Sequence, residues 1–88
     1  MPKVSVIVPC YNSSNFIKRT INSVLFQTFK DWELILVDDC SIDNTVEIIE
    51  EYVKRDPRIK LFKTEKNSGG PAHPKNVGLK EAKGEYIA

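Results

Sequence analysis

The feature that most constrains the fold is an apolar run that ends in two adjacent carboxylates. Residues 34–37 are Leu-Ile-Leu-Val, and Asp38 and Asp39 follow them directly. Four consecutive apolar residues indicate a strand that is buried on both faces, as in a parallel sheet covered by helices. The two aspartates then lie at the carboxyl end of that strand, which is the edge where open α/β sheets bind ligands. We therefore expect a ligand site at this edge.

Strands and helices are predicted to alternate along the whole chain. Short apolar or alternating segments predict strands over residues 3–9, 32–38, 59–62 and 85–88. Helical spacing of apolar residues predicts helices over 14–27 and 44–56. Pro74, which suits the first turn of a helix, and Gly84, which suits a C-terminal cap, predict a third helix over 74–83. This alternation is typical of βαβ units, which have right-handed crossovers. It predicts an α/β fold, a Rossmann-like three-layer α/β/α half-domain with parallel strands in the order 3-2-1-4.

Local signals predict where these elements begin and end. Pro9 should stop the first strand, because proline has no N–H for the strand ladder. The polar residues 12–15 can cap the helix that follows it. For the second helix, either Asp43 or Asn44 can be the cap, and Asn44 with Glu47 resembles a capping box.

Composition restricts the classes of function. A chain of 88 residues allows one small domain, and a net charge of +1 does not favour nucleic acid or a membrane surface as a partner. No apolar run has the length of a membrane span, and no signal peptide is recognisable. Cys10 and Cys40 do not form a disulfide framework, and together with His73 they lack the usual metal-ligand spacing. We expect both cysteines to be small buried thiols.

The familiar phosphate-binding loops are absent from the sequence. Neither G-x-G-x-x-G nor G-x-x-x-x-G-K-[ST] occurs, which argues against a dinucleotide dehydrogenase and a P-loop NTPase. Instead, Tyr11 follows the first strand and could either stack on a base or pack locally. The loop over residues 67–76 leads into a helix N-terminus, where Gly70 allows close approach and Lys75 adds a positive charge, so it favours an anion.

Asp38 and Asp39 should point in opposite directions if strand geometry continues through them. One carboxylate can then accept a hydrogen bond from the N3–H of a uracil-like base, while the other caps backbone amides or holds a loop. A divalent metal site or an acid–base pair is the alternative. Metal binding by adjacent residues needs a bent backbone, so the sequence favours base recognition.

Three segments together resemble the N-terminal half of the family-2 inverting glycosyltransferases, which have the GT-A fold. They are VSVIVPCYN at residues 4–12, LVDDCSIDNT at residues 36–45, and NSGG with KNVGL and AKGEYI within residues 67–87. They occur in the family's order and at similar spacing, and they cover nearly the whole chain. The form GPAHPKN at residues 70–76 resembles a subgroup that acts on bacterial surface polysaccharides.

The resemblance implies a nucleotide-diphosphate-sugar donor, commonly a UDP-sugar. Tyr11 would stack on uracil, and Asp39 would accept a hydrogen bond from the base N3–H. Asp38 and Asp43 match positions that shape the pocket. Lys75 stands where the family usually has an arginine near the base and phosphates, and it keeps the charge without the bidentate fork. The expected nucleotide-binding residues are Pro9, Tyr11, Asn12, Asp38, Asp39, Gly70 and Lys75.

The family's D-x-D motif, which holds Mn²⁺ or Mg²⁺ against the diphosphate, follows a strand like residues 84–87. Residues 1–88 would therefore be the N-terminal nucleotide-sugar-binding part, truncated before that motif. The metal ligands and the catalytic base would lie outside this chain, which should be inactive alone. The full-length enzyme would transfer a sugar to a hydroxyl of a saccharide or lipid-linked acceptor with inversion. It would act in bacterial surface polysaccharide synthesis, in the cytoplasm or at the inner face of the membrane.

Two other classes of protein could share these patterns. A non-catalytic nucleotide-binding or regulatory module could use the same half-fold. A receiver-like signalling domain would need a phosphoacceptor aspartate after the third strand, where this chain has Phe62-Lys63-Thr64. Whatever the class of the protein, a fourth strand without a further partner should favour self-association of this chain.

Overall fold

The structure is a computed structural model that describes residues 3–28, 30–64, 72–84 and 86–87. The side chains of Ala72, His73, Lys75, Tyr86 and Ile87 are outside this description. The elements in chain order are β1 (Val4–Cys10), α1 (Ile17–Leu25), β2 (Trp32–Asp38), α2 (Thr45–Arg55), β3 (Ile59–Lys63), α3 (Ala72–Glu81) and β4 (Tyr86–Ile87). They agree closely with the predicted elements.

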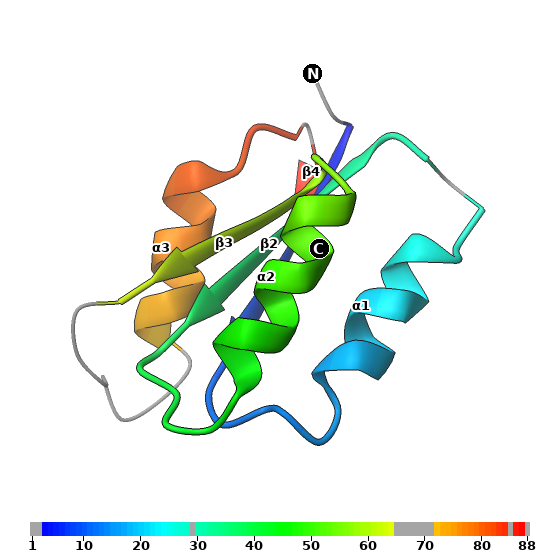
Figure 1. Ribbon diagram of the computed structural model, residues 1–88. Coiled ribbons are helices and arrows are strands. Elements are labelled where there is room, and N and C mark those ends of the chain that lie inside the picture. Colours follow the sequence, from blue (N-terminus) through cyan, green and yellow to red (C-terminus); the bar gives the residue numbers. More distant parts are fainter. Residues whose placement is uncertain (1–2, 29, 65–71, 85, 88) are drawn as a thin grey trace.

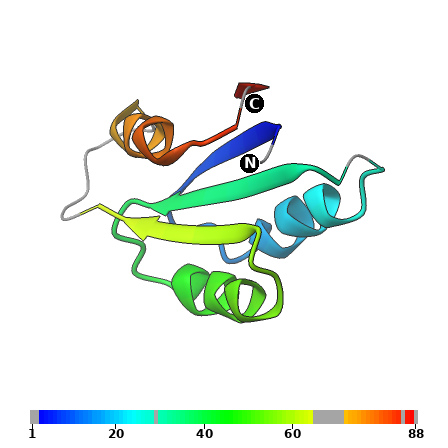
Figure 2. The same cartoon turned by 90° about the horizontal axis from the view of Figure 1, so that it is seen from above.

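The strands form one parallel sheet with the order β3-β2-β1-β4. Helices α1 and α2 cover one face of the sheet, and α3 covers the other (Figures 1 and 2). The pairing of β1 with β4 involves only Val4 and Ser5 on the β1 side. The predicted α/β class with three layers is confirmed.

Strand β2 is the centre of the core and is buried along its whole length. Leu34 and Leu36 pack with residues of α1 and α2, whereas Ile35 and Val37 pack with residues of α3. Successive side chains of a strand point to opposite faces, so an unbroken apolar run fills both layers of the core. This burial is what places Asp38 and Asp39 at the end of a rigid strand.

Pro9 does not end β1, contrary to the prediction, because the strand continues through Cys10. The carbonyl of Cys10 accepts a hydrogen bond from the N–H of Asp39, so Cys10 faces β2. Backbone groups alternate in direction along a strand, and Pro9 therefore faces the other side. On that side, within the described residues, β4 pairs only with the start of β1. The missing N–H of Pro9 thus costs no hydrogen bond to β2.

The predicted helix caps are also partly wrong. Helix α1 has Phe16 at its N-cap, with no side-chain cap hydrogen bond; the carbonyl of Ser13 accepts from the N–H groups of Phe16 and Ile17 instead. Asn44 is the N-cap of α2, and its side chain makes no cap hydrogen bond either. The side chain of the adjacent Asp43 makes such a bond instead, because its carboxylate accepts from the N–H of Thr45 at 3.0 Å.

A buried carboxylate joins the strands at the amino end of the sheet. Glu33 accepts hydrogen bonds from the hydroxyl of Ser5 at 2.5 Å, from Nζ of Lys60 at 2.9 Å and from the N–H of Lys83 at 2.6 Å. Burial alone would raise the pKa of Glu33, but these three donors outweigh it and lower the pKa to about 2. This network, which the sequence patterns did not reveal, ties the α3–β4 connection to β1 and β2.

Candidate functional site

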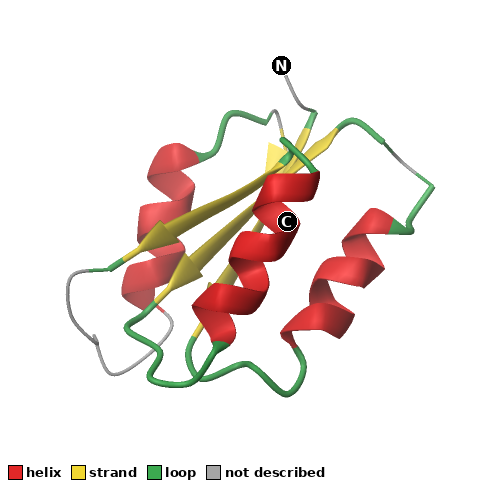
Figure 3. Cartoon of the chain, viewed as in Figure 1, coloured by secondary structure: helices red, strands yellow, loops and turns green. Residues whose placement is uncertain are grey.

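The loops after β1 and β2 meet the end of β3 at one edge of the sheet. We call the carboxyl edge the set of residues 10–14, 38–45 and 64. Figure 3 shows these connections in green beyond the strand arrowheads. The backbone ladder continues into this edge, since Asp39 donates to the carbonyl of Cys10 at 2.8 Å and Thr64 donates to the carbonyl of Asp38 at 2.9 Å. The ends of three neighbouring strands are therefore in direct contact.

Asp38 fixes the conformation of the loop that follows it. Its carboxylate accepts hydrogen bonds from the N–H of Ser41 at 3.0 Å and from the Ser41 hydroxyl at 2.5 Å. The same Ser41 oxygen accepts from the N–H of Asn12 at 2.8 Å, and Oδ1 of Asn12 accepts from the N–H of Ile42 at 2.9 Å. Asp38, Ser41 and Asn12 thus join the two loops. The sequence left several roles open for Asp38, and these contacts correspond to that of a carboxylate that holds a loop.

Asp39 points to a different neighbour. Its Oδ1 accepts a hydrogen bond from the hydroxyl of Thr64 at 2.7 Å, on the side of β3. Asp38 and Asp39 therefore contact different loops, as the alternation along a strand predicts. Only 3% of Asp39 is exposed, so a ligand at this edge would reach a small part of the carboxylate.

Asp43 makes a second connection between the two loops. One of its oxygens accepts from the N–H and the hydroxyl of Thr45, and the other accepts from the N–H of Ser14 at 3.2 Å. The hydroxyl of Thr45 also accepts from the N–H of Ser13 at 2.8 Å. The hydrogen bond from the Thr45 hydroxyl is the main reason that the pKa of Asp43 is lowered to about 2. Its contacts are structural, as predicted for a helix-capping residue.

Tyr11 is the exposed aromatic residue of this edge. Half of its surface, 51%, is open to solvent, and its N–H donates to the hydroxyl of Ser13. The backbone turns sharply beside it, since Asn12 has a φ of 48°. Cys40 in the neighbouring loop also lies in the left-handed region, with a φ of 61°. Two tight turns therefore leave the Tyr11 side chain at the surface next to the strand ends.

The remaining predicted residues are only partly covered by the structure. Pro9 is half-buried in β1, directly before the edge. Gly70 lies outside the described residues. Lys75 belongs to α3, but its side chain, like that of His73, is outside the description. The structure thus brings Pro9, Tyr11, Asn12, Asp38 and Asp39 together and does not place the predicted anion-binding loop.

The described residues do not form a metal site. No group of three or more His, Cys, Asp and Glu residues within them could hold a metal ion. Asp38 and Asp39 diverge, and hydroxyl donors already bind both. Cys10 and Cys40 are free thiols. Burial of Cys10, helped by the negative charge of Asp38, raises its pKa to about 12, so it stays protonated and is a poor metal ligand.

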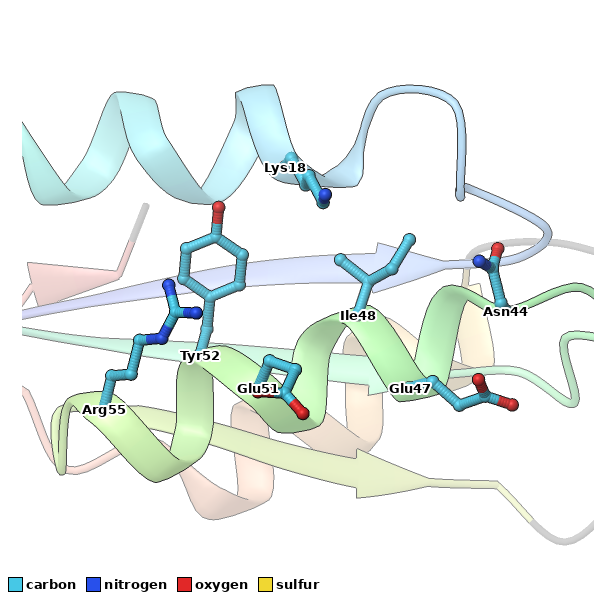
Figure 4. A pocket seen from close by; sticks show the side chains of 7 residues that line it. All are labelled: Lys18, Asn44, Glu47, Ile48, Glu51, Tyr52 and Arg55. Atoms are coloured by element: carbon cyan, nitrogen blue, oxygen red, sulfur yellow. The ribbon is translucent and has the colours of Figure 1, made fainter.

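A separate hollow of about 350 Å³ lies between α1 and α2 (Figure 4). The cations Lys18 and Arg55 share its rim with the carboxylates Glu47 and Glu51. Because charges of both signs alternate there, the hollow has no single-sign field for a phosphate. It contains none of the predicted site residues, and we do not assign it to nucleotide binding.

A parallel sheet with tight loops, an exposed aromatic side chain and paired carboxylates at its carboxyl edge defines a ligand-binding α/β domain of the Rossmann-like class. A family model narrows this class, since that of "Glycosyl transferase family 2" matches residues 5–88. The chain therefore belongs to glycosyltransferase family 2.

Relatives of known name are longer than this chain. It is 46% identical to the poly(ribitol-phosphate) beta-N-acetylglucosaminyltransferase TarS of Staphylococcus aureus, covering 99% of this chain and 15% of TarS. It is 47% identical to a Bacillus subtilis protein named "Putative teichuronic acid biosynthesis glycosyltransferase TuaG". This match covers 99% of this chain and 34% of TuaG. The chain thus spans about a third or less of the length of these two relatives.

Solved structures agree with the fold. The crystal structure of S. aureus TarS 1–349 in complex with UDP matches with a TM-score of 0.90 at 46% identity, covering 97% of this chain and 25% of that one. The mannosyltransferase PcManGT from Pyrobaculum calidifontis, in complex with GDP-Man and Mn²⁺, matches with a TM-score of 0.88 at 29% identity, covering 98% and 26%. The GT-A type of the fold is confirmed by these neighbours.

Proposed function

We propose that the carboxyl edge binds the base of a nucleotide-sugar donor, and that the donor is a UDP-sugar. One observation carries the proposal: the N–H of Asp39 bonds to the carbonyl of Cys10, the residue directly before Tyr11. An exposed ring and a carboxylate are therefore held at the ends of adjacent strands. The ring offers a stacking surface, and the carboxylate offers an acceptor for a base N–H. The matching TarS structure in complex with UDP supports this choice of ligand.

In this proposal the predicted site residues have distinct roles. Tyr11 stacks on uracil and Asp39 accepts from its N3–H. Asp38 and Asn12 hold the two loops in place through Ser41, and Pro9 lines the base pocket. On the resemblance to the family, Lys75 would lie near the base and phosphates, and Gly70 would allow close approach of the backbone to the anion.

We propose that residues 1–88 are the nucleotide-sugar-binding part of a longer inverting glycosyltransferase. That enzyme would transfer a sugar to a hydroxyl of a saccharide or lipid-linked acceptor in bacterial surface polysaccharide synthesis. The named activities of TarS and TuaG support this assignment. We further propose a location in the cytoplasm or at the inner face of the membrane. Within the described residues, no helix has the length and apolar character to cross a membrane.

We propose that a divalent metal ion, Mn²⁺ or Mg²⁺, serves the full-length enzyme, in line with the Mn²⁺ complex of PcManGT. The described residues of this chain do not fit that ion, since they offer no cluster of ligands. Its ligands would therefore lie elsewhere. We also propose that the 88-residue chain self-associates through the edge of the sheet on the side of β1 and β4.

Calorimetric titration of the chain with UDP tests the site. Asp39→Ala and Tyr11→Ala should each weaken binding by about tenfold, because each removes one contact worth roughly 1.5 kcal/mol. Asp31→Ala, which changes an exposed aspartate before β2, is the control and should bind like the wild type. Equal affinities of all four proteins would refute the assignment of the base site.

A further inference from the structure

The residue after β3, Thr64, contacts the carboxylate that the proposed function assigns to the base. Its hydroxyl donates to Oδ1 of Asp39 at 2.7 Å. Its N–H donates to the carbonyl of Asp38 at 2.9 Å, and its carbonyl accepts from Sγ of Cys40 at 3.5 Å. Thr64 is therefore bonded to three successive residues at the end of β2.

The Thr64 hydroxyl is not needed to pair the strands. The N–H of Thr64 already continues the ladder between β2 and β3 beyond Lys63, the last residue of β3. The side-chain bond to Asp39 is additional. It acts on a buried residue, since only 3% of the surface of Asp39 is exposed. In such surroundings a hydrogen bond to a charged group is stronger than in water.

The geometry of this bond suits the orientation of an acceptor. A hydroxyl that donates to one carboxylate oxygen fixes the plane of the group and keeps it an acceptor. Threonine is well suited to this task, because its β-branch restricts the rotation of its own side chain. A carboxylate held in this way meets an incoming N–H at a defined angle.

We propose that Thr64 is a positioning residue that sets the preference of the site for uracil through the orientation of Asp39. This inference rests on the proposed function, in which Asp39 accepts from the base N3–H. Uracil carries a hydrogen on N3, whereas N3 of cytosine is an unprotonated acceptor that faces a carboxylate unfavourably. Correct orientation of Asp39 therefore favours uridine over cytidine nucleotides. Loss of the Thr64 hydroxyl reduces this difference.

The test compares the affinities of the 88-residue chain for UDP and CDP. Thr64→Val removes the hydroxyl at nearly constant shape, and Thr64→Ser keeps it. Thr28→Val makes the same replacement at an exposed position and is the matched control. We expect the ratio of UDP affinity to CDP affinity to fall about tenfold in Thr64→Val. This change corresponds to one charge-assisted hydrogen bond. Thr64→Ser and Thr28→Val should keep the wild-type preference.

The outcomes separate the two proposals. Asp39→Asn should also lose the preference; if it does and Thr64→Val does not, the positioning role is refuted while the base site stands. If Asp39→Asn keeps the preference, the base site itself is refuted, and the role of Thr64 falls with it. An equal loss of UDP and CDP affinity in Thr64→Val would show a merely structural role. Should Thr64→Val fail to give a dispersed amide spectrum, Thr64→Ala is measured in its place against the same criteria.

Discussion

At the scale of single residues, backbone conformation limits which side chains the carboxyl edge accepts. Cys40 has a φ of 61°, where a residue with a Cβ atom is strained by about 1–2 kcal/mol. The turn at this position directs the chain from Asp39 toward Ser41, whose hydroxyl binds Asp38 and Asn12. The strain is therefore the cost of the loop that joins the two strand ends.

Replacement of Cys40 tests this strain. Cys40→Gly relieves it but adds freedom to the unfolded chain worth about 0.4–1 kcal/mol, so its stability should stay within about 1 kcal/mol of the wild type. Cys40→Val should lower the free energy of unfolding by more than about 1 kcal/mol, because a β-branched residue is poorly tolerated at positive φ. Urea unfolding measures both changes. Cys40→Ser is the control of similar shape, and equal stability of the Val and Ser variants would contradict the argument.

Individual site residues differed in how far the sequence could predict them. Asp38 and Asp39 were found because an unbroken apolar run before them fixes their place on the sheet. Ser41 and Thr64 were missed, since a hydroxyl has a partner only once the loops have folded. Their signal was weak: each is a hydroxyl residue within a few positions of a strand end. Contacts between loops that are 25 or more residues apart do not appear in a local pattern.

At the scale of elements, hydrogen bonds from buried polar groups hold the sheet at its amino end. Glu33 on β2 binds Ser5 on β1, Lys60 on β3 and the N–H of Lys83 after α3. The hydroxyl of Ser5 in turn accepts from the N–H of Gly84 at 2.8 Å. A Cβ at Gly84 would lie 2.7 Å from the backbone N of Ser5, so only glycine fits this approach.

Glu33→Gln should therefore lower the free energy of unfolding by about 2–3 kcal/mol near neutral pH, because its amide group faces donors that need an acceptor. The pKa of Glu33 is lowered from 4.5 to about 2 on folding. A lowered pKa contributes stability above 4.5, and this contribution disappears as the pH falls toward 2. The difference between wild type and variant should shrink over that range in thermal unfolding. A difference that is independent of pH would contradict the role of the charge.

The elements themselves were easier to predict than their ends. The strands and the first two helices were expected from apolar spacing and the third helix from Pro74 and Gly84, and the sheet followed from their alternation. The ends depend on tertiary contacts: Pro9 is tolerated inside β1 because of the side it faces, and Asp43 rather than Asn44 binds the start of α2 because Ser14 and Thr45 are both within reach.

At the scale of the whole molecule, the sheet has an open side. Within the described residues, β4 consists of two residues that pair with Val4 and Ser5, and the rest of β1 has β2 as its only paired neighbour. Backbone N–H and C=O groups along such an edge can pair with another chain. Apolar side chains beside it, those of Val4 and Val6, line a hollow of about 320 Å³ near Trp32.

We therefore expect the 88-residue chain to self-associate reversibly through this edge, because strand pairing and burial of the apolar hollow both favour it. Sedimentation velocity over a hundredfold range of concentration, roughly 10 µM to 1 mM, measures the effect, and the weight-average mass should rise with concentration toward that of a dimer. Ile42→Asp is the control, because Ile42 is an exposed apolar residue, 88% open to solvent, in the loop after β2, and it does not line that hollow. It should leave association unchanged. A single monomeric species at every concentration, or loss of association in Ile42→Asp, would contradict pairing through the sheet.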